Sequence, residues 1–206
     1  MILRKLSLCA ALIFLTACAG LKPTLSELEK SDIIERAHRA APSACAYAGR
    51  VRLRYLDEAG QIRASSVVLK TCSGDMEIKV LGLFGAVAAE IGVNDGEYLV
   101  MSKGEDVTGE FAMTVTPADV EVIQRAMSLP PELPDMSFDA RRHNGGYVFT
   151  KGEHTIYLDG SYMVGSVEHP HYSVAYRWDG KAPFSITISR SDMVLELIFS
   201  DKWKLD

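Results

Sequence analysis

The fold is decided by residues 45–72, which read CAYAGRVRLRYLDEAGQIRASSVVLKTC. Within residues 50–55, arginines alternate with apolar side chains, which is the two-residue period of a half-buried strand with a basic outer face. Residues 57–60 (Asp-Glu-Ala-Gly) have the composition of a turn. The partner strand follows at residues 61–71, where Arg63 and Ser65 alternate with Ile62, Ala64 and Ser66. The segment therefore predicts an antiparallel β-hairpin.

The two cysteines that end this stretch are expected to face each other. If Leu56 pairs with Gln61, every pair of opposed positions adds up to 117, and this places Cys45 opposite Cys72. Opposed residues of antiparallel strands have Cα atoms about 4.5–5.5 Å apart, within disulfide reach. We predict a cross-strand disulfide formed in an oxidising compartment. The alternative is a pair of buried free thiols.

Period-two alternation recurs along most of the remaining chain. The pairs Asp159-Gly160 and Asp179-Gly180 mark turns between successive strands. Residues 129–134 (Leu-Pro-Pro-Glu-Leu-Pro) predict an irregular connector rather than a domain boundary, because strands resume after it. Further strands are predicted at residues 76–80, 87–91, 98–101, 147–150, 154–158, 172–178, 184–189 and 194–200.

Two helices are predicted beside these strands. Residues 24–41 contain Ser26 and Glu29 at the spacing of a capping box. Residues 116–127 begin with Thr-Pro, a good N-cap followed by a good first helical residue. The fold class is therefore mainly β (α+β), with one large antiparallel sheet. A sheet of this size tends to curl, and the second helix then fills part of its concave side and leaves an apolar pocket.

The composition is that of a globular protein. The chain has 206 residues, of which 48% are hydrophobic and 24% charged, and its formal net charge is −5. These fractions exclude disordered and collagen-like chains. The chain has no basic patch, so no nucleic-acid partner is expected. No apolar run reaches the roughly 18 residues that a membrane-spanning helix needs.

The N-terminus has the pattern of an export signal. Arg4 and Lys5 form a basic head, residues 6–15 are apolar, and small residues precede Cys18. This order resembles the bacterial lipobox, which implies cleavage before Cys18 and attachment of lipid to its side chain. The alternative is an ordinary signal peptide with an incidental cysteine.

The lipobox divides the chain into three parts. We expect a signal peptide at 1–17, a lipidated tether at 18–23 and a single domain at 24–206. In lipoprotein sorting, Ala19 after the lipidated residue resembles an outer-membrane destination. The expected location is therefore the outer membrane, with a lipid anchor and a domain that faces the periplasm.

Several short motifs follow the lipobox in a fixed order. They are residues 48–53 (AGRVRL), 81–85 (LGLFG), 87–91 (VAAEI), 95–100 (DGEYLV) and 193–199 (MVLELIF), with Trp203 near the end. Their order and spacing resemble the LolB family of outer-membrane lipoprotein receptors and, more loosely, the LolA carriers. The apparent disulfide is a departure from the family pattern.

The resemblance implies a half-open antiparallel barrel with helices as its lid or plug. It also implies binding and transfer rather than enzymatic catalysis, without a cofactor. Acyl chains of lipoproteins or lipids would enter the apolar concavity, a LolA-like periplasmic carrier would supply them, and the outer membrane would receive them. The lipid-binding cavity would be lined by Val51, Leu53, Tyr55, Ile62, Met76, Ile78, Val80, Val87, Ala89 and Ile91. The alternative is a closed, dry core, as in a structural subunit of an outer-membrane complex.

One predicted hairpin tip is unusually apolar. By position, Leu83 and Phe84 match the protruding hairpin tip of the family, where Leu usually stands in place of Phe84. Hairpin tips are normally polar, and exposed large apolar groups mark contact with a partner or a membrane. We predict a membrane-contact loop at these two residues. The alternative is that the tip folds back onto the protein.

An enzymatic function has weaker support. His169 and His171 lie at strand spacing, and with His154 or His143 they would give enough ligands for Zn²⁺. Pro170 between them favours a surface loop, so we expect no metal site. A metal-dependent hydrolase is the least favoured alternative, and the sequence has no nucleophile elbow, phosphate loop or zinc-protease helix.

Overall fold

The computed structural model describes residues 24–43, 45–58, 60–94, 97–111, 116–200 and 204–205. The predicted signal peptide, Cys18, the tether and Trp203 lie outside these residues. Within the described ranges, no helix is long and apolar enough to cross a membrane. The helices are α2 (Glu27–Ala40), the single 3₁₀ turn η1 (Leu83–Gly85), α3 (Thr108–Phe111) and α4 (Pro117–Ala126).

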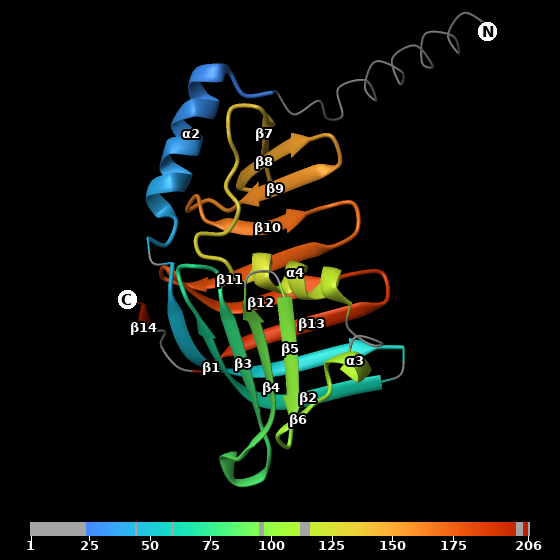
Figure 1. The fold of residues 1–206 in the computed structure, drawn as a ribbon. Coiled ribbons are helices and arrows are strands. Elements are labelled where there is room, and N and C mark those ends of the chain that lie inside the picture. Colours follow the sequence, from blue (N-terminus) through green and yellow to red (C-terminus); the bar gives the residue numbers. More distant parts are fainter. Residues whose placement is uncertain are drawn as a thin grey trace, which may run out of the picture.

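The strands form one antiparallel sheet, shown in Figure 1. Along the sheet the order is β6-β5-β4-β3-β2-β1-β13-β12-β11-β10-β9-β8-β7, and β14 pairs with β1. The two ends, β6 and β7, do not meet, so the sheet is open. The bounds are β1 (Tyr47–Asp57), β2 (Gly60–Lys70), β3 (Met76–Leu81), β4 (Val87–Asn94), β5 (Glu97–Ser102), β6 (Glu105–Asp106), β7 (Asp139–His143), β8 (Gly146–Lys151), β9 (His154–Leu158), β10 (Val164–Glu168), β11 (Ser173–Asp179), β12 (Ala182–Ser189), β13 (Met193–Phe199) and β14 (Lys204–Leu205).

The predicted fold class is confirmed as mainly β with a single antiparallel sheet. Figure 1 shows that the sheet twists strongly, so that β3–β6 run across the direction of β7–β13. Strong twist over so many strands follows from the right-handed twist of each strand pair. The result is an open, curved sheet rather than a closed barrel.

The register of the first hairpin is confirmed. Tyr47 pairs with Lys70 and Asp57 pairs with Gly60, as the predicted pairing requires. The disulfide Cys45–Cys72 forms just beyond this ladder, with its Cα atoms 4.9 Å apart. At the other end, the backbone N–H of Gly60 donates a hydrogen bond to Oδ1 of Asp57 over 3.0 Å.

Both predicted helices form with their predicted N-terminal caps. The Ser26 hydroxyl accepts from the backbone N–H of Glu29, whose carboxylate accepts in return from the Ser26 backbone. Thr116 and Asp119 form the same capping box at the start of α4, and Pro117 is its first residue. Each box satisfies N–H groups that a helix start otherwise leaves unpaired.

Several elements were not predicted from the sequence. The edge strand β7 reads Asp-Ala-Arg-Arg-His, which has too few apolar residues for a visible alternation. Strand β10 contains Gly165 and a register shift against β9 between Val164 and Ser166, which breaks the two-residue period. The short elements α3, β6 and β14 also have no clear sequence signal. Strands β6, β7, β10 and β14 form because their neighbours in the sheet supply the hydrogen-bonding partners.

Helix α4 lies on the apolar face of the sheet and contacts both β5 and β12. The Tyr47 hydroxyl donates to the carbonyl oxygen of Met127 over 2.7 Å. The Tyr176 hydroxyl donates to the carbonyl oxygen of Ala126 over 3.1 Å. Two strands from opposite halves of the sheet therefore hold the end of one helix, and the core is continuous beneath it.

Helix α2 and the connector after α4 pack together beside the second half of the sheet. The buried ammonium group of Lys30 donates to the carbonyl oxygens of Met136 at 3.0 Å and Phe138 at 3.1 Å. Ala37, near the end of α2, and Leu133, in the connector, both belong to the core or pack against it. Of these two helices, α4 is the one that packs on β5, in the first half of the sheet.

Candidate functional site

The apolar face of β1–β5 is covered at one end and open at the other. Near α4, the side chains of Val51, Met76 and Ile78 are buried. Burial falls along β1–β4 from the ends near Tyr47 and Met76 toward the turn between β1 and β2 and the turn between β3 and β4. At that far end the Ile62 side chain is 61% exposed.

The ten residues predicted to line a cavity therefore lie in three environments. Leu53, Tyr55, Val80, Ala89 and Ile91 are half-buried. Val51, Met76 and Ile78 belong to the packed core, whereas Ile62 and Val87 are exposed. We call the half-open part the distal apolar face and define it as Leu53, Tyr55, Ile62, Ala64, Val80 and Ala89.

The distal apolar face is formed by strand pairing. Leu53 pairs with Ala64, and Tyr55 pairs with Ile62, so these four side chains lie on one face of β1 and β2. Val80 pairs with Ala89 and continues that face across β3 and β4. Helix α4 has ten residues, which gives it a length of about 15 Å. Its C-terminal end lies at Tyr47, and the side chains of the face toward Ile62 and the β3–β4 turn remain half-buried or exposed.

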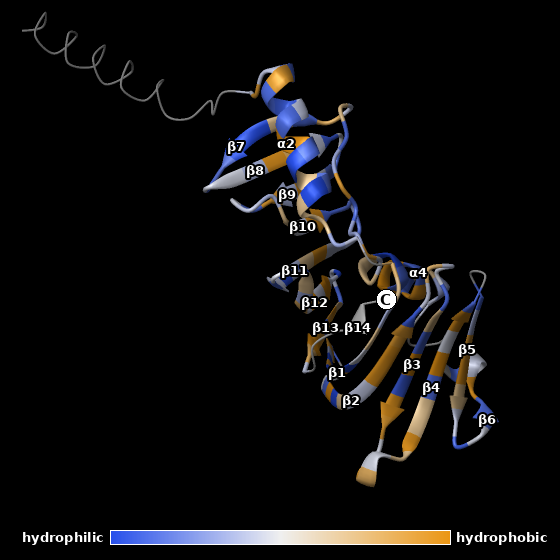
Figure 2. Cartoon of the chain, turned by 90° about the vertical axis from the view of Figure 1, so that its left-hand side faces the viewer, coloured by the Kyte–Doolittle hydropathy of each residue, from blue (hydrophilic) through white to orange (hydrophobic). Residues whose placement is uncertain are grey.

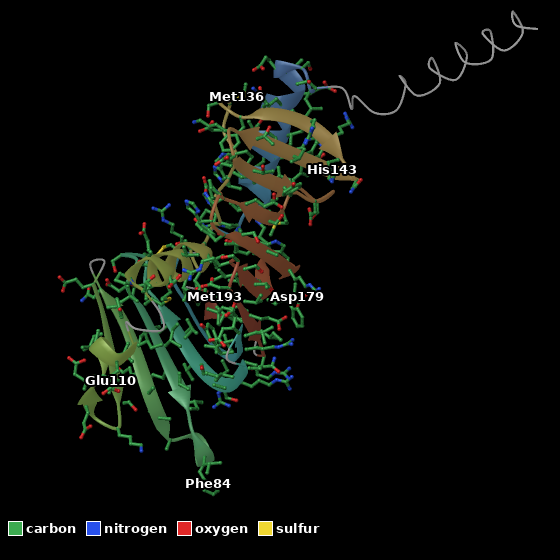
Figure 3. The ribbon with its side chains drawn as sticks, turned by 90° about the vertical axis from the view of Figure 1, so that its right-hand side faces the viewer. Phe84, Glu110, Met136, His143, Asp179 and Met193 are labelled. Atoms are coloured by element: carbon green, nitrogen blue, oxygen red, sulfur yellow. A yellow bond between two sulfur atoms is a disulfide. The ribbon has the colours of Figure 1, made fainter. Side chains whose placement is uncertain are left out.

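The turn between β3 and β4 presents two large apolar side chains to solvent. Leu83 is 85% exposed and Phe84 105% exposed. Figure 3 shows Phe84 at the far tip of the molecule, pointing away from the sheet. Figure 2 shows hydrophobic bands that alternate with hydrophilic ones along β3 and β4, and hydrophobic colouring at the tip beyond them. The tip and the distal apolar face therefore lie at the same end of the protein.

The backbone at this tip has an unusual conformation. Phe84 has φ of 61° and ψ of 18°, a left-handed conformation that large L-residues rarely adopt. A non-glycine residue held there costs on the order of 1 kcal/mol. The turn is closed by a 2.7 Å hydrogen bond from the Gly82 N–H to the Ala86 carbonyl oxygen. Because Phe84 has no burial to offset this cost, stability does not explain its presence.

Helix α4 is fixed to the surrounding loops by polar contacts. Arg190, in the turn between β12 and β13, forms an ion pair with the buried carboxylate of Asp119. Its guanidinium also bonds Asp192 at 2.7 Å, and this hydrogen bond lowers the pKa of the Asp192 carboxyl. Gln124 donates to the carbonyl oxygen of Gly74 over 2.7 Å. These contacts hold α4 over the covered end of the apolar face.

Replacing Arg190 by Ala is expected to destabilise the protein by about 2 kcal/mol, because it leaves the buried Asp119 carboxylate without its ion-pair partner. The expected loss of stability is smaller than for a fully buried ion pair, because the Arg190 side chain is 33% exposed. Urea unfolding of both proteins measures the difference. The control is Arg125→Ala, which removes an exposed pair with Glu121 on the same helix and costs about 0.5 kcal/mol or less. Equal losses in the two variants would contradict the anchoring role.

Two of the pockets lie beside α4, over β10–β13. One has a volume of about 320 Å³ and is lined by residues that include Arg125, Glu132, His169, Tyr172 and Tyr176. The other has a volume of about 310 Å³ and is lined by residues that include Asp119, Val122, His171, Ile188 and Arg190. Sequence periodicity could not predict either pocket, because each pocket forms only when a helix and a loop pack against the sheet.

The histidines are arranged differently from the pattern considered in the sequence. His169 stacks on His154 with ring centroids 4.2 Å apart, whereas His171 is exposed and lines the other pocket. His143 contacts the ring of Tyr157 instead. Burial, followed by the neighbouring imidazole of His154, lowers the pKa of His169. The strand spacing of His169 and His171 therefore did not identify the pair that the fold brings together, which is His154 and His169.

Comparisons with known proteins identify the fold. No model of a protein family matches the sequence, and no curated protein matches it. A LolA superfamily protein from Nitrosomonas europaea superposes with a TM-score of 0.50 at 13% identity, covering 85% of this chain and 93% of that one. A Vibrio parahaemolyticus protein described as an outer membrane lipoprotein-sorting domain gives a TM-score of 0.50 at 9% identity, covering 88% and 94%. At these identities the likeness shows a shared fold.

Proposed function

From the premise that this chain has a LolA/LolB-like fold, we propose that it binds acyl chains of lipoproteins or lipids and helps insert lipoproteins into the outer membrane. The observation that carries the proposal is the distal apolar face, which stays open to solvent and runs toward the exposed tip at Leu83 and Phe84. The process is binding and transfer, without covalent chemistry.

The distal apolar face is suited to reversible binding. Each methylene group moved from water onto an apolar surface contributes roughly 0.8 kcal/mol. An acyl chain that passes from this face into a bilayer exchanges one apolar environment for another, so the net cost of transfer is small. An open face that ends at the membrane-contact tip allows this exchange without a passage through water.

Helix α4 acts as the lid in this proposal. It covers the near end of the apolar face and contacts β5 on one side and β12 on the other. An acyl chain on the distal face would extend toward α4 and contact half-buried Leu53 and Tyr55, which already pack against the core. The lid therefore sets the inner limit of the binding surface.

The remaining parts of the proposal concern location and partners. Lipid on Cys18 would hold the protein at the outer membrane with its domain in the periplasm, and Ala19 favours that destination. A LolA-like periplasmic carrier is the proposed donor of lipoprotein. The sorting domain from Vibrio parahaemolyticus, which shares the fold, supports a role in the same class of transport.

Replacing Ile62 by Glu is expected to reduce acyl-chain binding at least tenfold, because it places a charge in the distal apolar face. The assay is titration with a fluorescent fatty acid, supported by native mass spectrometry, on the Cys18→Ser chain so that its own lipid is not counted. Leu69→Glu is the matched control, since Leu69 is 44% exposed on the same strand but on the opposite face. No acyl binding by the parent chain, or equal losses in both variants, would contradict the proposal.

A further inference from the structure

We propose that Glu132, His154 and His169 form a binding site for a divalent transition-metal ion of the Zn²⁺ class. The three residues come from separate parts of the chain. Glu132 lies in the connector after α4, His154 begins β9, and His169 follows β10. The site is remote from the distal apolar face and does not depend on the proposed function.

The donor atoms of this cluster are close to the spacing that a metal requires. One donor atom from each residue lies within 4.8 Å of the other two. Nε2 of His154 is 3.5 Å from Oε1 of Glu132, and Nε2 of His169 is 3.5 Å from Oε2 of the same carboxylate. In a tetrahedral site with metal–ligand bonds of about 2.0–2.1 Å, donor atoms lie about 3.4 Å apart. The two imidazoles are stacked at 4.2 Å, so binding requires the rings to turn until both Nε2 lone pairs point at the ion.

One of these donor atoms has no hydrogen-bond partner. Within the described part of the chain, Nε2 of His154 is buried and unpaired, because its 3.5 Å contact with Glu132 does not meet hydrogen-bond geometry. A buried polar atom without a partner carries a free-energy cost. A metal ion bound to that nitrogen removes this cost and gives the Glu132 carboxylate a positive partner.

The surroundings hold the two imidazoles in place. The ring of Phe138 contacts His154 edge-on at 5.3 Å, and the ring of Tyr172 stacks on His169 at 4.5 Å. Phe138 and Tyr172 therefore flank the imidazole pair on either side. Two imidazoles and a carboxylate are a ligand set that zinc accepts, with a fourth position left open. Glu132 and His169 also line the 320 Å³ pocket, which gives that fourth position access to solvent.

A fixed positive charge beside the site is compensated. Arg125 lines the same pocket as Glu132 and His169. Its guanidinium is paired with Glu121 at 2.7 Å, which reduces its repulsion of a bound cation. The net environment therefore favours a divalent ion held by one carboxylate and two neutral imidazoles.

A bound ion would link three segments. It would tie the connector that follows α4 to β9 and to the loop between β10 and β11. Since Met127 and Ala126 at the end of α4 are already bonded to Tyr47 and Tyr176, fixing the connector would restrain the helix at its C-terminal end. The ion would thereby raise the resistance of this region to unfolding.

The test is a Zn²⁺ titration of the untagged, purified protein after treatment with a chelator. Isothermal calorimetry and native mass spectrometry are expected to show one Zn²⁺ per chain and a rise in Tm. His154→Ala and His169→Ala should each lower the affinity at least tenfold. Glu132→Gln keeps the shape of the carboxylate and should also weaken binding, so the test does not depend on a truncated side chain.

The matched control is His171→Ala, which removes an exposed imidazole from the same loop and should bind Zn²⁺ as the parent does. Far-ultraviolet circular dichroism checks that each variant is folded. Absence of stoichiometric Zn²⁺ binding by the parent would overturn the proposal. An equal loss of affinity in His171→Ala and His169→Ala would also overturn it, because the ion would then be bound elsewhere on the loop.

Discussion

Replacing Phe84 by Glu is expected to block delivery of lipoprotein to the outer membrane while the protein still folds. The side chain is 105% exposed, so the substitution removes no native packing. Burying a Phe side chain in lipid contributes roughly 1.5–3 kcal/mol, which corresponds to about a 10- to 100-fold change in membrane docking. A carboxylate at the tip loses this contribution and adds the cost of bringing a charge to the bilayer. Transfer of a labelled lipoprotein to liposomes measures the effect.

Two further variants make this test specific. Phe184→Glu changes another exposed phenylalanine, which is 49% exposed on β12, and should transfer normally. Phe84→Leu keeps an apolar tip and should retain most of the activity. If Phe84→Glu delivers lipoprotein at the parental rate, the membrane-contact role of the tip is wrong.

Removal of the Cys45–Cys72 disulfide is expected to lower the free energy of unfolding by about 3–4 kcal/mol. The two cysteines are 27 residues apart, and closing a loop of that length restricts the unfolded chain by about this amount in the chain-entropy model. A domain of ordinary stability has about 5–15 kcal/mol in total, so the loss is large. Urea unfolding of the double variant Cys45→Ser/Cys72→Ser against the oxidised parent measures it.

The reduced parent protein is the control for this prediction. Treatment with a thiol reductant should bring the parent close to the stability of the double variant. If the double variant instead unfolds at the same urea concentration as the oxidised parent, the bridge contributes nothing to stability. The hairpin register would then be held by strand pairing alone.

Local sequence patterns determined much of the fold. The pairing of Leu56 with Gln61 followed from the turn, and it fixed the register that brings Cys45 and Cys72 together. The N-caps at Ser26 and Thr116 could also be predicted from the sequence, because capping depends on residues three positions apart. Edge strand β7 could not be predicted from the sequence, because it is held by backbone pairing with β8 and its own side chains show no alternation.

The functional surface could be predicted only in part. Alternation along β1–β4 predicted one face that contains Ile62, Ile78 and Ala89, and the strand pairing places these three together. The register shift after Val80 pairs Val87 with Leu81, on the opposite face, which alternation did not predict. Alternation also gave the same signal for buried Ile78 and exposed Ile62. The exposure of Leu83 and Phe84 also depended on how far the turn projects from the sheet. In the structure, His154 at the start of β9 stacks on His169, which lies in a loop eleven residues beyond the end of β9. The strand spacing of His169 and His171 had instead suggested that those two histidines act together.

The sequence by itself determined most of the strands, the hairpin register, the disulfide and most of the apolar side of the sheet, because each of these depends on neighbours along the chain or across one turn. Only the tertiary structure decided where α4 lies, which part of the apolar face it leaves open, and which polar groups meet beside it. The physical reason is that a two-residue period records that a face is apolar, whereas what covers that face is fixed by packing between segments distant in the chain.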